Sequence, residues 1–362
     1  MTALGLLICA IWIYLLVFRG RFWLFADPPD PGPAPAASVT AVMPARNEAE
    51  VIARSLQSLS KQQYPGPFRI VVVDDHSDDG TAAIAAPFAE VIRAKPLPLG
   101  WTGKLWAVSQ GVTQAGEPEY LLLTDADIVH APANLASLVA RARAGNYDLV
   151  SYMAKLRCES FAERALIPAF VFFFFMLYPP AWATGAAGGC MLIRREALER
   201  IGGIAAIRGE LIDDCALAKA VKQSGGRVWL GLNHSVESIR VYGSVAEIAH
   251  MISRTAFTQL NYSATLLAAT LAGLALVYLA PPALTLAGNP WGAPAWLMMS
   301  IAYLPALRYY RRSPLWAPLL PLIAAFYMGC TLASALQHWR GAGGAWKGRV
   351  ASQWRRPPGL RS

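Results

Sequence analysis

Uncharged apolar runs lie at both ends of this chain and frame a middle region in which apolar and polar positions alternate. The first run spans residues 2–18 and is followed at once by Arg19 and Arg21. Past Arg254 the chain carries no acidic residue. Three more apolar runs follow there: residues 264–284, 291–307 and 314–336. Runs of this length predict helices that span, or partly span, a membrane.

The first run predicts an N-terminal transmembrane anchor over residues 1–20. A secretory signal peptide is the alternative, but it requires a basic start and a small-residue cleavage site, and this segment has neither. By the positive-inside rule, Arg19 and Arg21 then lie on the cytoplasmic side. We therefore expect a multi-pass protein of the plasma (inner) membrane whose middle region faces the cytoplasm.

The C-terminal runs, residues 264–338, predict transmembrane or re-entrant helices whose number stays open. Three complete spans would place the basic tail, residues 340–362, outside the cell, which the positive-inside tendency disfavours. The last run contains three prolines and is expected to be re-entrant or interfacial, because non-helical backbone persists in a membrane only where protein covers it. These prolines are Pro314, Pro318 and Pro321.

Strand-like and helix-like periods alternate over residues 38–260, after a Pro-rich linker at residues 27–37. Such alternation predicts an α/β fold with a mostly parallel sheet. Asn47 and Glu50 have the spacing of a capping box for the first helix. The expected strands are 38–45, 68–75, 90–95, 120–127, 148–154, 189–194 and 227–232. The expected helices are 47–60, 81–88, 104–115 and 215–224.

An uncharged segment interrupts this region at residues 165–193, and Phe172–Phe175 is its most apolar part. It is long enough to span a membrane. A single crossing would separate the acidic residues before it from those after it, and one catalytic site cannot lie on both sides of a bilayer. Residues 165–184 are therefore predicted to be interfacial or re-entrant. An ordinary buried helix is the alternative.

The composition narrows the class of protein further. The chain is 55% hydrophobic and only 15% charged, which is too apolar for an ordinary soluble enzyme. Its net charge of +9 comes mostly from Arg and Lys beside the apolar runs, which indicates contact with anionic lipid head groups and no nucleic-acid partner. The five cysteines form no CxxC pair, which is typical of a reducing cytoplasm and argues against a zinc site.

Asp125 and Asp127 end the apolar run that begins at Tyr120. Residues two apart in a strand share a face, so both carboxylates are expected to project together from the carboxyl end of a strand, where open α/β sheets bind ligands. Hard oxygen ligands at that spacing suit Mg²⁺ or Mn²⁺ held against a diphosphate. Such a short motif also arises by chance, so its value depends on the residues around it.

Asp74 and Asp75 end the second expected strand. Either can accept hydrogen bonds from a nucleotide base or ribose, and helix capping is the alternative. Lys104 precedes a helix and can meet a phosphate as a point charge, although a solvated lysine fits the spacing equally well.

Gly188 and Gly189 let the backbone approach a ligand closely, or they form a tight turn into a strand. Asp213 and Asp214 open a helix, where a carboxylate either stabilises the helix end or serves as a general base for an acceptor hydroxyl. Arg254 is placed to meet a diphosphate at the membrane surface.

Five segments in order resemble the family 2 inverting glycosyltransferases with the GT-A fold, over residues 38–260. These segments are Pro44–Glu48, Val73–Thr81, Thr124–Asp127, Gly185–Arg194 and Asp213–Leu217. Within that family, three further segments resemble the hopanoid-biosynthesis-associated membrane glycosyltransferases. They are Gly100–Lys104, Arg254–Leu260 and Trp346–Arg349.

The resemblance implies a role for each matching residue. Asp74 and Asp75 would bind the nucleotide, and the nucleotide-sugar would also contact Pro44, Arg46, Glu48, Lys104 and Arg254. Asp125 and Asp127 would serve the ribose and the divalent metal, Mg or Mn, and Asp214 would be the base, with Asp213 beside it. Processive synthases of the family carry Gln-x-x-Arg-Trp, whereas this chain has Met251 and a Thr after Arg254. That difference favours transfer of a single sugar.

We therefore expect a membrane enzyme that moves one sugar from a nucleotide-sugar, a UDP-sugar first of all, to a lipid acceptor such as a hopanoid. The acceptor would enter past Phe173, Phe174 and Trp182 and lie against Gly188 and Gly189. Three alternatives stay open: a nucleotidyltransferase, which would release pyrophosphate, a processive polysaccharide synthase, and a transporter or scaffold. The last is disfavoured because the C-terminal runs lack the intramembrane ionisable residues that mark transport paths.

Overall fold

The computed structural model describes residues 2–25, 28–29 and 31–341. Within these residues the chain forms two compact units. The sheet unit lies within residues 28–156 and 183–240, and the helical unit within residues 2–25, 157–182 and 241–341. The predicted basic tail lies outside the described residues from position 342 on.

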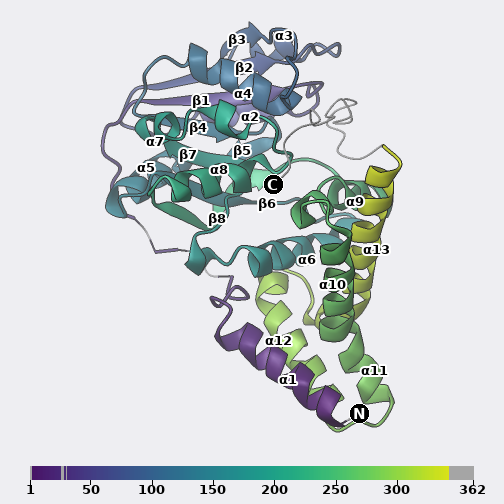
Figure 1. Ribbon diagram of the computed structural model, residues 1–362. Coiled ribbons are helices and arrows are strands. Elements are labelled where there is room, and N and C mark those ends of the chain that lie inside the picture. Colours follow the sequence, from purple (N-terminus) through teal and green to yellow (C-terminus); the bar gives the residue numbers. More distant parts are fainter. Residues whose placement is uncertain (1, 26–27, 30, 342–362) are drawn as a thin grey trace. The chain divides into compact units, whose positions relative to one another are not determined.

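An eight-stranded mixed sheet forms the sheet unit (Figure 1). Its strands are β1 (Val39–Ala45), β2 (Phe68–Asp74), β3 (Glu90–Arg93), β4 (Tyr120–Thr124), β5 (Ile128–His130), β6 (Leu149–Lys155), β7 (Cys190–Arg194) and β8 (Val228–Ser238). They lie in the order β3-β2-β1-β4-β7-β6-β8-β5. Pairs β2–β3, β1–β2, β1–β4 and β6–β8 are parallel, and β7 and β5 run antiparallel to their neighbours. The predicted mostly parallel α/β sheet is confirmed.

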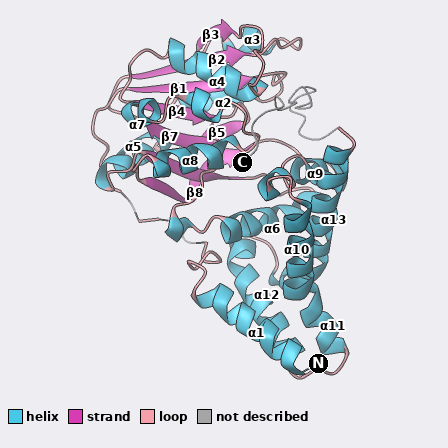
Figure 2. Cartoon of the chain, viewed as in Figure 1, coloured by secondary structure: helices cyan, strands magenta, loops and turns pink. Residues whose placement is uncertain are grey.

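Helices cover both faces of this sheet (Figure 2). One face packs against α2 (Ile52–Ser60), α3 (Thr81–Ala85) and α5 (Asn134–Ala144). The other packs against α4 (Gly103–Gln114), α7 (Arg195–Arg200) and α8 (Asp213–Gln223). Strand β1 is consequently buried at every position, as expected for a strand covered on both sides.

Two local predictions were wrong. Strand β4 ends at Thr124, so Asp125 and Asp127 lie in the turn that follows and not within a strand. The capping box at Asn47 does not form: α2 begins at Ile52 without a side-chain cap. Asn47 instead has a left-handed backbone, with φ of 51°, and its side chain accepts a hydrogen bond from the Asp78 N–H.

A buried polar chain links the end of β4 to the glycine loop before β7. His130 is 3% exposed, and its Nδ1 lies 2.9 Å from the Asn134 amide nitrogen. Thr124 Oγ1 donates to the Gly189 carbonyl and therefore accepts from His130 Nε2, 3.0 Å away. His130 is thus neutral with the proton on Nε2, and burial lowers its pKa to about 4.

The helical unit contains α1 (Thr2–Val17), α6 (Phe161–Leu177), α9 (Val245–Ser253), α10 (Ala264–Leu274), α11 (Ala280–Leu286), α12 (Gly292–Tyr309) and α13 (Leu320–Trp339). Three helical segments are long and apolar enough to cross a membrane: Phe161–Trp182, Ala264–Leu286 and Pro314–Trp339. Helix α1 is apolar but shorter. The backbone is helical from Pro314 onward, because the prolines occupy a 3₁₀ turn and the start of α13, so the expected non-helical backbone is not found there.

A π-turn, Ala275–Leu279, joins α10 to α11 and shows how side chains in this unit hydrogen-bond backbone groups that lack a helical partner. Pro281 has no N–H, so the Val277 carbonyl lacks its ordinary helical partner. Trp12 of α1 donates its indole N–H to that carbonyl at 3.0 Å. The Trp12 ring also meets Tyr278 edge-on, with centroids 5.6 Å apart. The turn that interrupts the span therefore becomes the docking point for α1.

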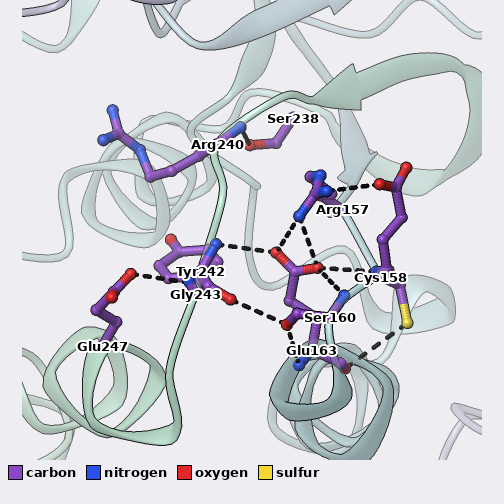
Figure 3. Close-up of polar contacts among 10 residues, drawn as sticks. Arg157, Cys158, Ser160, Glu163, Ser238, Arg240, Tyr242, Gly243 and Glu247 are labelled. Atoms are coloured by element: carbon purple, nitrogen blue, oxygen red, sulfur yellow. Dashed lines mark hydrogen bonds and ion pairs between the residues drawn. The ribbon is translucent and has the colours of Figure 1, made fainter.

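Glu163, in the first turn of α6, is fully buried and is surrounded by hydrogen-bond donors (Figure 3). Its oxygens accept from Arg157 at 3.0 Å and from the backbone N–H groups of Glu159, Ser160 and Tyr242 at 2.8–2.9 Å. These four groups satisfy the buried carboxylate with hydrogen bonds. One carboxylate thus joins the segments that follow β6 and β8.

We expect acid to destabilise this protein partly through His130. The unfolded chain binds a proton near the ordinary pKa of 6.5, whereas the folded chain binds it only near 4. The contribution of neutral His130 to the free energy of unfolding is fully present above about pH 6.5. It is lost as pH falls toward 4, and the total loss is about 3 kcal/mol. Thermal midpoints of the full-length chain between pH 7 and 4.5 measure it. His130→Gln, which cannot titrate, should show a shallower decline, and parallel declines would contradict the assignment.

Candidate active site

The loops after parallel strands β1, β2 and β4 meet at one edge of the sheet, as their parallel register requires. The β1 loop carries Arg46 and Glu48, the β2 loop follows Asp74, and the β4 turn carries Asp125 and Asp127. Most of the site residues predicted from the sequence therefore gather here within the sheet unit.

The β1 and β2 loops are tied together by hydrogen bonds. The Glu48 N–H donates to Thr81 Oγ1 at 2.9 Å, and the Ala49 N–H donates to Asp79 Oδ2 at 2.9 Å. Arg46 donates to the Asp75 carbonyl at 2.5 Å, and its Nη1 lies 3.5 Å from the Asp75 carboxylate. The two loops consequently form one preorganised surface rather than two independent strand ends.

Asp74 and Asp75 differ in their contacts. The Asp74 carboxylate accepts from the Ser77 N–H at 3.3 and 3.4 Å and so shapes the turn. Asp79 accepts from the Thr81 N–H at 3.0 Å, where α3 begins. Nucleotide contact by Asp74 or Asp75 stays a prediction.

Lys104 lies between two acidic side chains. Its Nζ is 3.0 Å from Asp125 Oδ1 and 2.9 Å from Asp213 Oδ2. Thr102 caps α4 by accepting from the Leu105 N–H, which fixes the first turn that carries the lysine. Burial alone would lower the pKa of Lys104, but the two carboxylates outweigh it and raise that pKa above the usual lysine value. Lys104 is therefore a fixed positive charge in the site.

Asp214 lies beside this pair and is held by two backbone groups. Its oxygens accept from the Gly188 N–H at 2.8 Å and from the Cys215 N–H at 2.7 Å. A Cβ on Gly188 would lie 3.3 Å from Asp214 Oδ2, so glycine permits this close approach. Burial, and then the neighbouring Asp213, raise the pKa of Asp214 to about 6 in spite of Lys104. Such a carboxylate is ionised at pH 7 and basic enough to accept a proton.

Asp125 contacts Lys104, whereas Asp127 contacts Arg240. The prediction that both carboxylates project together from one face is therefore wrong. Arg240 Nε donates to Asp127 Oδ2 at 2.8 Å, and Arg240 Nη2 donates to both oxygens of Glu48 at 2.8 and 3.0 Å. Arg240 was missed from the sequence because β8 was expected to end at residue 232. The strand continues to Ser238 and brings Arg240 to the same edge.

Carboxylates outnumber basic side chains in this region of the described chain. The contacts among the described residues join Glu48, Asp125, Asp127, Asp213 and Asp214 with Lys104 and Arg240. A cluster of carboxylates attracts cations.

The donor chemistry of these residues suits a divalent metal. Asp125 and Asp213 already converge on one positive group. Among the described residues, no three His, Cys, Asp or Glu side chains gather closely enough to hold an ion by themselves. Mg²⁺ and similar ions are commonly held by one or two carboxylates together with substrate phosphates, so the residues present fit that arrangement.

A pocket of about 320 Å³, part of it open to solvent, adjoins these side chains. Pro44, Lys104, Asp125, Gly188 and Asp213 line it, together with aliphatic side chains from β4, β7, α4 and α8. The end of strand β1, the lysine, the first Asp of the pair, the glycine loop and the start of α8 therefore line one pocket, and their roles there stay predictions.

The other predicted residues belong to the helical unit. Arg254 follows α9 and is exposed. Phe173 packs against Tyr327 and Tyr278, with ring centroids 4.9 and 5.5 Å away. Phe174 faces Tyr178 at 5.3 Å. Trp182 is 38% exposed, and Arg19 lies over its ring at 4.5 Å. Their contact with an acceptor or a diphosphate stays a prediction.

Comparison with known proteins agrees with this geometry. Residues 40–202 match the family model described as Glycosyl transferase family 2. A mannosyltransferase from Pyrobaculum calidifontis, in complex with GDP-Man and Mn²⁺, is similar in structure with a TM-score of 0.59. That match has 20% sequence identity and covers 93% of this chain and 99% of the other.

Glucosyl-3-phosphoglycerate synthase from Mycobacterium tuberculosis, in complex with Mn²⁺ and UDP-glucose, matches at a TM-score of 0.44 and 18% identity. That match covers 62% of this chain and 78% of the other.

The contact between Lys104 and its two carboxylates can be tested by a double-mutant cycle. Lys104→Met leaves Asp125 and Asp213 facing each other without their shared cation, so the thermal midpoint should fall by several degrees. Adding Asp213→Asn removes one of the repelling charges and should restore part of that loss. Strictly additive losses in the double variant would show that the three groups do not interact.

The match to the Glycosyl transferase family 2 model covers residues 40–202, which is less than half of the chain. Together with the sheet topology and the structural similarity, it shows a mixed α/β domain with a GT-A-like fold.

Proposed function

We propose that this protein is a membrane-bound inverting glycosyltransferase that transfers one sugar from a nucleotide-sugar to a lipid hydroxyl. The observation that carries the proposal is Asp214, a carboxylate fixed by two backbone N–H groups, with a pKa raised to about 6, beside a pocket that Lys104, Asp125 and Asp213 line. A hopanoid is the first acceptor to test. A UDP-sugar is the first sugar donor, and GDP-mannose the second because of the similar Pyrobaculum enzyme.

Each group of the site has a task in this reaction. Asp214 takes the proton from the acceptor hydroxyl as that oxygen attacks the anomeric carbon from the face opposite the diphosphate, which inverts the configuration. Lys104 meets the negative charge that develops on the departing diphosphate. Asp125, with Asp127, would hold the divalent metal, whose chemistry is to neutralise that leaving group.

The membrane assignment rests on the three helical segments that are long and apolar enough to cross a bilayer. A lipid acceptor that stays in the bilayer would need to reach the pocket near the membrane surface. Exposed Trp182, with Arg19 over its ring, has the chemistry of an interfacial anchor. The sheet unit would then face the cytoplasm, where nucleotide-sugars are available, and the basic side chains would contact anionic lipids.

Asp214→Asn should abolish turnover because the amide cannot accept the proton. The side chain keeps its size, so the affinity for nucleotide should stay within about twofold of the wild-type value.

Wild-type turnover should fall as pH drops below about 6, where Asp214 becomes protonated. The measurement is release of nucleoside diphosphate from a panel of nucleotide-sugars in the presence of membrane lipid extract. Full activity of Asp214→Asn would refute the base assignment, and release of pyrophosphate from a nucleoside triphosphate would indicate a nucleotidyltransferase.

The acceptor entrance is tested by changing Phe173 and Phe174 to Ser, which should reduce transfer to lipid far more than hydrolysis of the sugar donor by water. Burial of each ring in the membrane contributes about 1.5–3 kcal/mol of favourable free energy, enough to hold the acceptor entrance against the membrane. Because Phe173 also packs between two tyrosines, Phe174→Ser alone is the cleaner variant. Phe172→Leu, at a fully buried ring, is the packing control. Equal loss of both activities would make the segment a structural element only.

A further inference from the structure

Arg240 contacts two acidic side chains that the proposed function places near the sugar donor. Its Nε donates to Asp127 at 2.8 Å, while its Nη2 donates to both oxygens of Glu48 at 2.8 and 3.0 Å. Glu48 and Asp127 lie on loops that follow different strands, β1 and β4. One guanidinium therefore joins two loops of the site.

The contact engages Asp127 in a particular way. Arg240 Nε and Ser238 Oγ both donate to the same oxygen, Oδ2, at 2.8 and 3.3 Å. Two donors on one oxygen fix the rotation of the carboxylate about its side chain. The side chain of Asp127 is only 13% exposed and that of Glu48 only 11%, whereas that of Arg240 is 34% exposed, so the acidic partners are largely shielded from solvent.

The backbone around Arg240 is held by contacts within the sheet unit. Its own N–H donates to Ser238 Oγ at 3.4 Å (Figure 3), and the N–H of the preceding residue, Ile239, donates to the Asp127 carbonyl at 2.9 Å. A long side chain on a fixed backbone loses little further freedom when it binds, which suits a positioning role.

We propose that Arg240 is a positioning residue that sets the orientation of Asp127, and with it Glu48, for a divalent metal bound with the sugar donor. This inference rests on the proposed function. A planar guanidinium can bind Glu48 with one nitrogen and Asp127 with another at the same time, which a lysine ammonium cannot do in the same geometry. Groups that hydrogen-bond metal-binding carboxylates usually change metal affinity 10–100-fold when removed.

An ordinary ion pair at the surface would behave differently. Exposed pairs contribute little and tolerate replacement. Arg195 and Glu199 form an ion pair away from the site in the same unit, 2.6 Å apart on α7, with the Glu199 side chain 59% exposed and the Arg195 side chain 23% exposed. Arg195 also donates to the Gly116 carbonyl at 2.9 Å. Arg195→Gln is therefore the matched control for the loss of one arginine charge away from the site.

The test measures Mn²⁺ binding by electron paramagnetic resonance on the full-length chain in detergent, first with Mn²⁺ alone and then with Mn²⁺ and UDP or GDP. Arg240→Gln should weaken Mn²⁺ binding 10–100-fold, Arg240→Lys should lie between it and wild type, and Ser238→Ala should show a smaller loss. Arg195→Gln should bind as wild type does. Thermal midpoints identify any variant that fails to fold, in which case Arg240→Lys and Ser238→Ala decide the question.

If Arg240→Gln folds, wild-type Mn²⁺ affinity in that variant would overturn the positioning role. If it does not fold, wild-type Mn²⁺ affinity in both Arg240→Lys and Ser238→Ala would overturn it. Equal loss in Arg195→Gln would also overturn it, because the effect would then be one of net charge. A steady-state comparison adds a second readout: positioning predicts that excess Mn²⁺ restores kcat in Arg240→Lys. Failure of the proposed function is seen separately, as a wild-type protein that releases no nucleoside diphosphate from any nucleotide-sugar.

Discussion

Repulsion among carboxylates is the constraint that shapes the edge of this sheet. Asp125 and Asp213 each lie about 3 Å from Lys104 Nζ, so their oxygens are at most about 6 Å apart. At that distance, with an effective dielectric constant of about 20, two unit charges repel by about 3 kcal/mol. That is a large part of the stability of a typical domain. Lys104, which lies between the two carboxylates, thus stabilises the folded state before any ligand is bound.

The topology explains why these charges meet at all. Strands β1, β2 and β4 are adjacent and parallel, so their following loops emerge together. Antiparallel β7 runs the opposite way and delivers the glycine loop from its amino end to the same edge, where Gly188 reaches Asp214. The Thr124 hydroxyl holds the Gly189 carbonyl, and buried His130 holds that hydroxyl. A neutral core network thereby supports a highly charged surface.

The parts of the fold that depend on local periodicity could be predicted from the sequence. Strands β1 and β2 and helix α4 begin and end within a residue or so of the expected positions, because apolar patterns and turn residues agree there. The end of β4 was missed because Ala126 continues the apolar pattern past Thr124, where the backbone turns. The capping box at Asn47 failed because a contact from a distant loop, the Asp78 N–H, competes for the same side chain.

In the candidate site, too, local features could be predicted and tertiary contacts could not. Asp125, Lys104 and Asp213 could be identified separately from strand ends and helix starts. The two carboxylates converge on the Lys104 ammonium group only in the tertiary structure, and the spacing of these residues along the sequence does not predict that contact. Arg240 had no local signal, since its partners lie 113 and 192 residues away in the sequence.

Helix α6 has a practical consequence for anyone who wishes to study the sheet unit alone in water. Residues 157–182 belong to the helical unit, yet they are inserted between β6 and β7 of the sheet unit. Trimming the chain at both ends would still leave this apolar helix inside the product. A soluble version needs an internal excision with a short linker from Leu156 to Ala183.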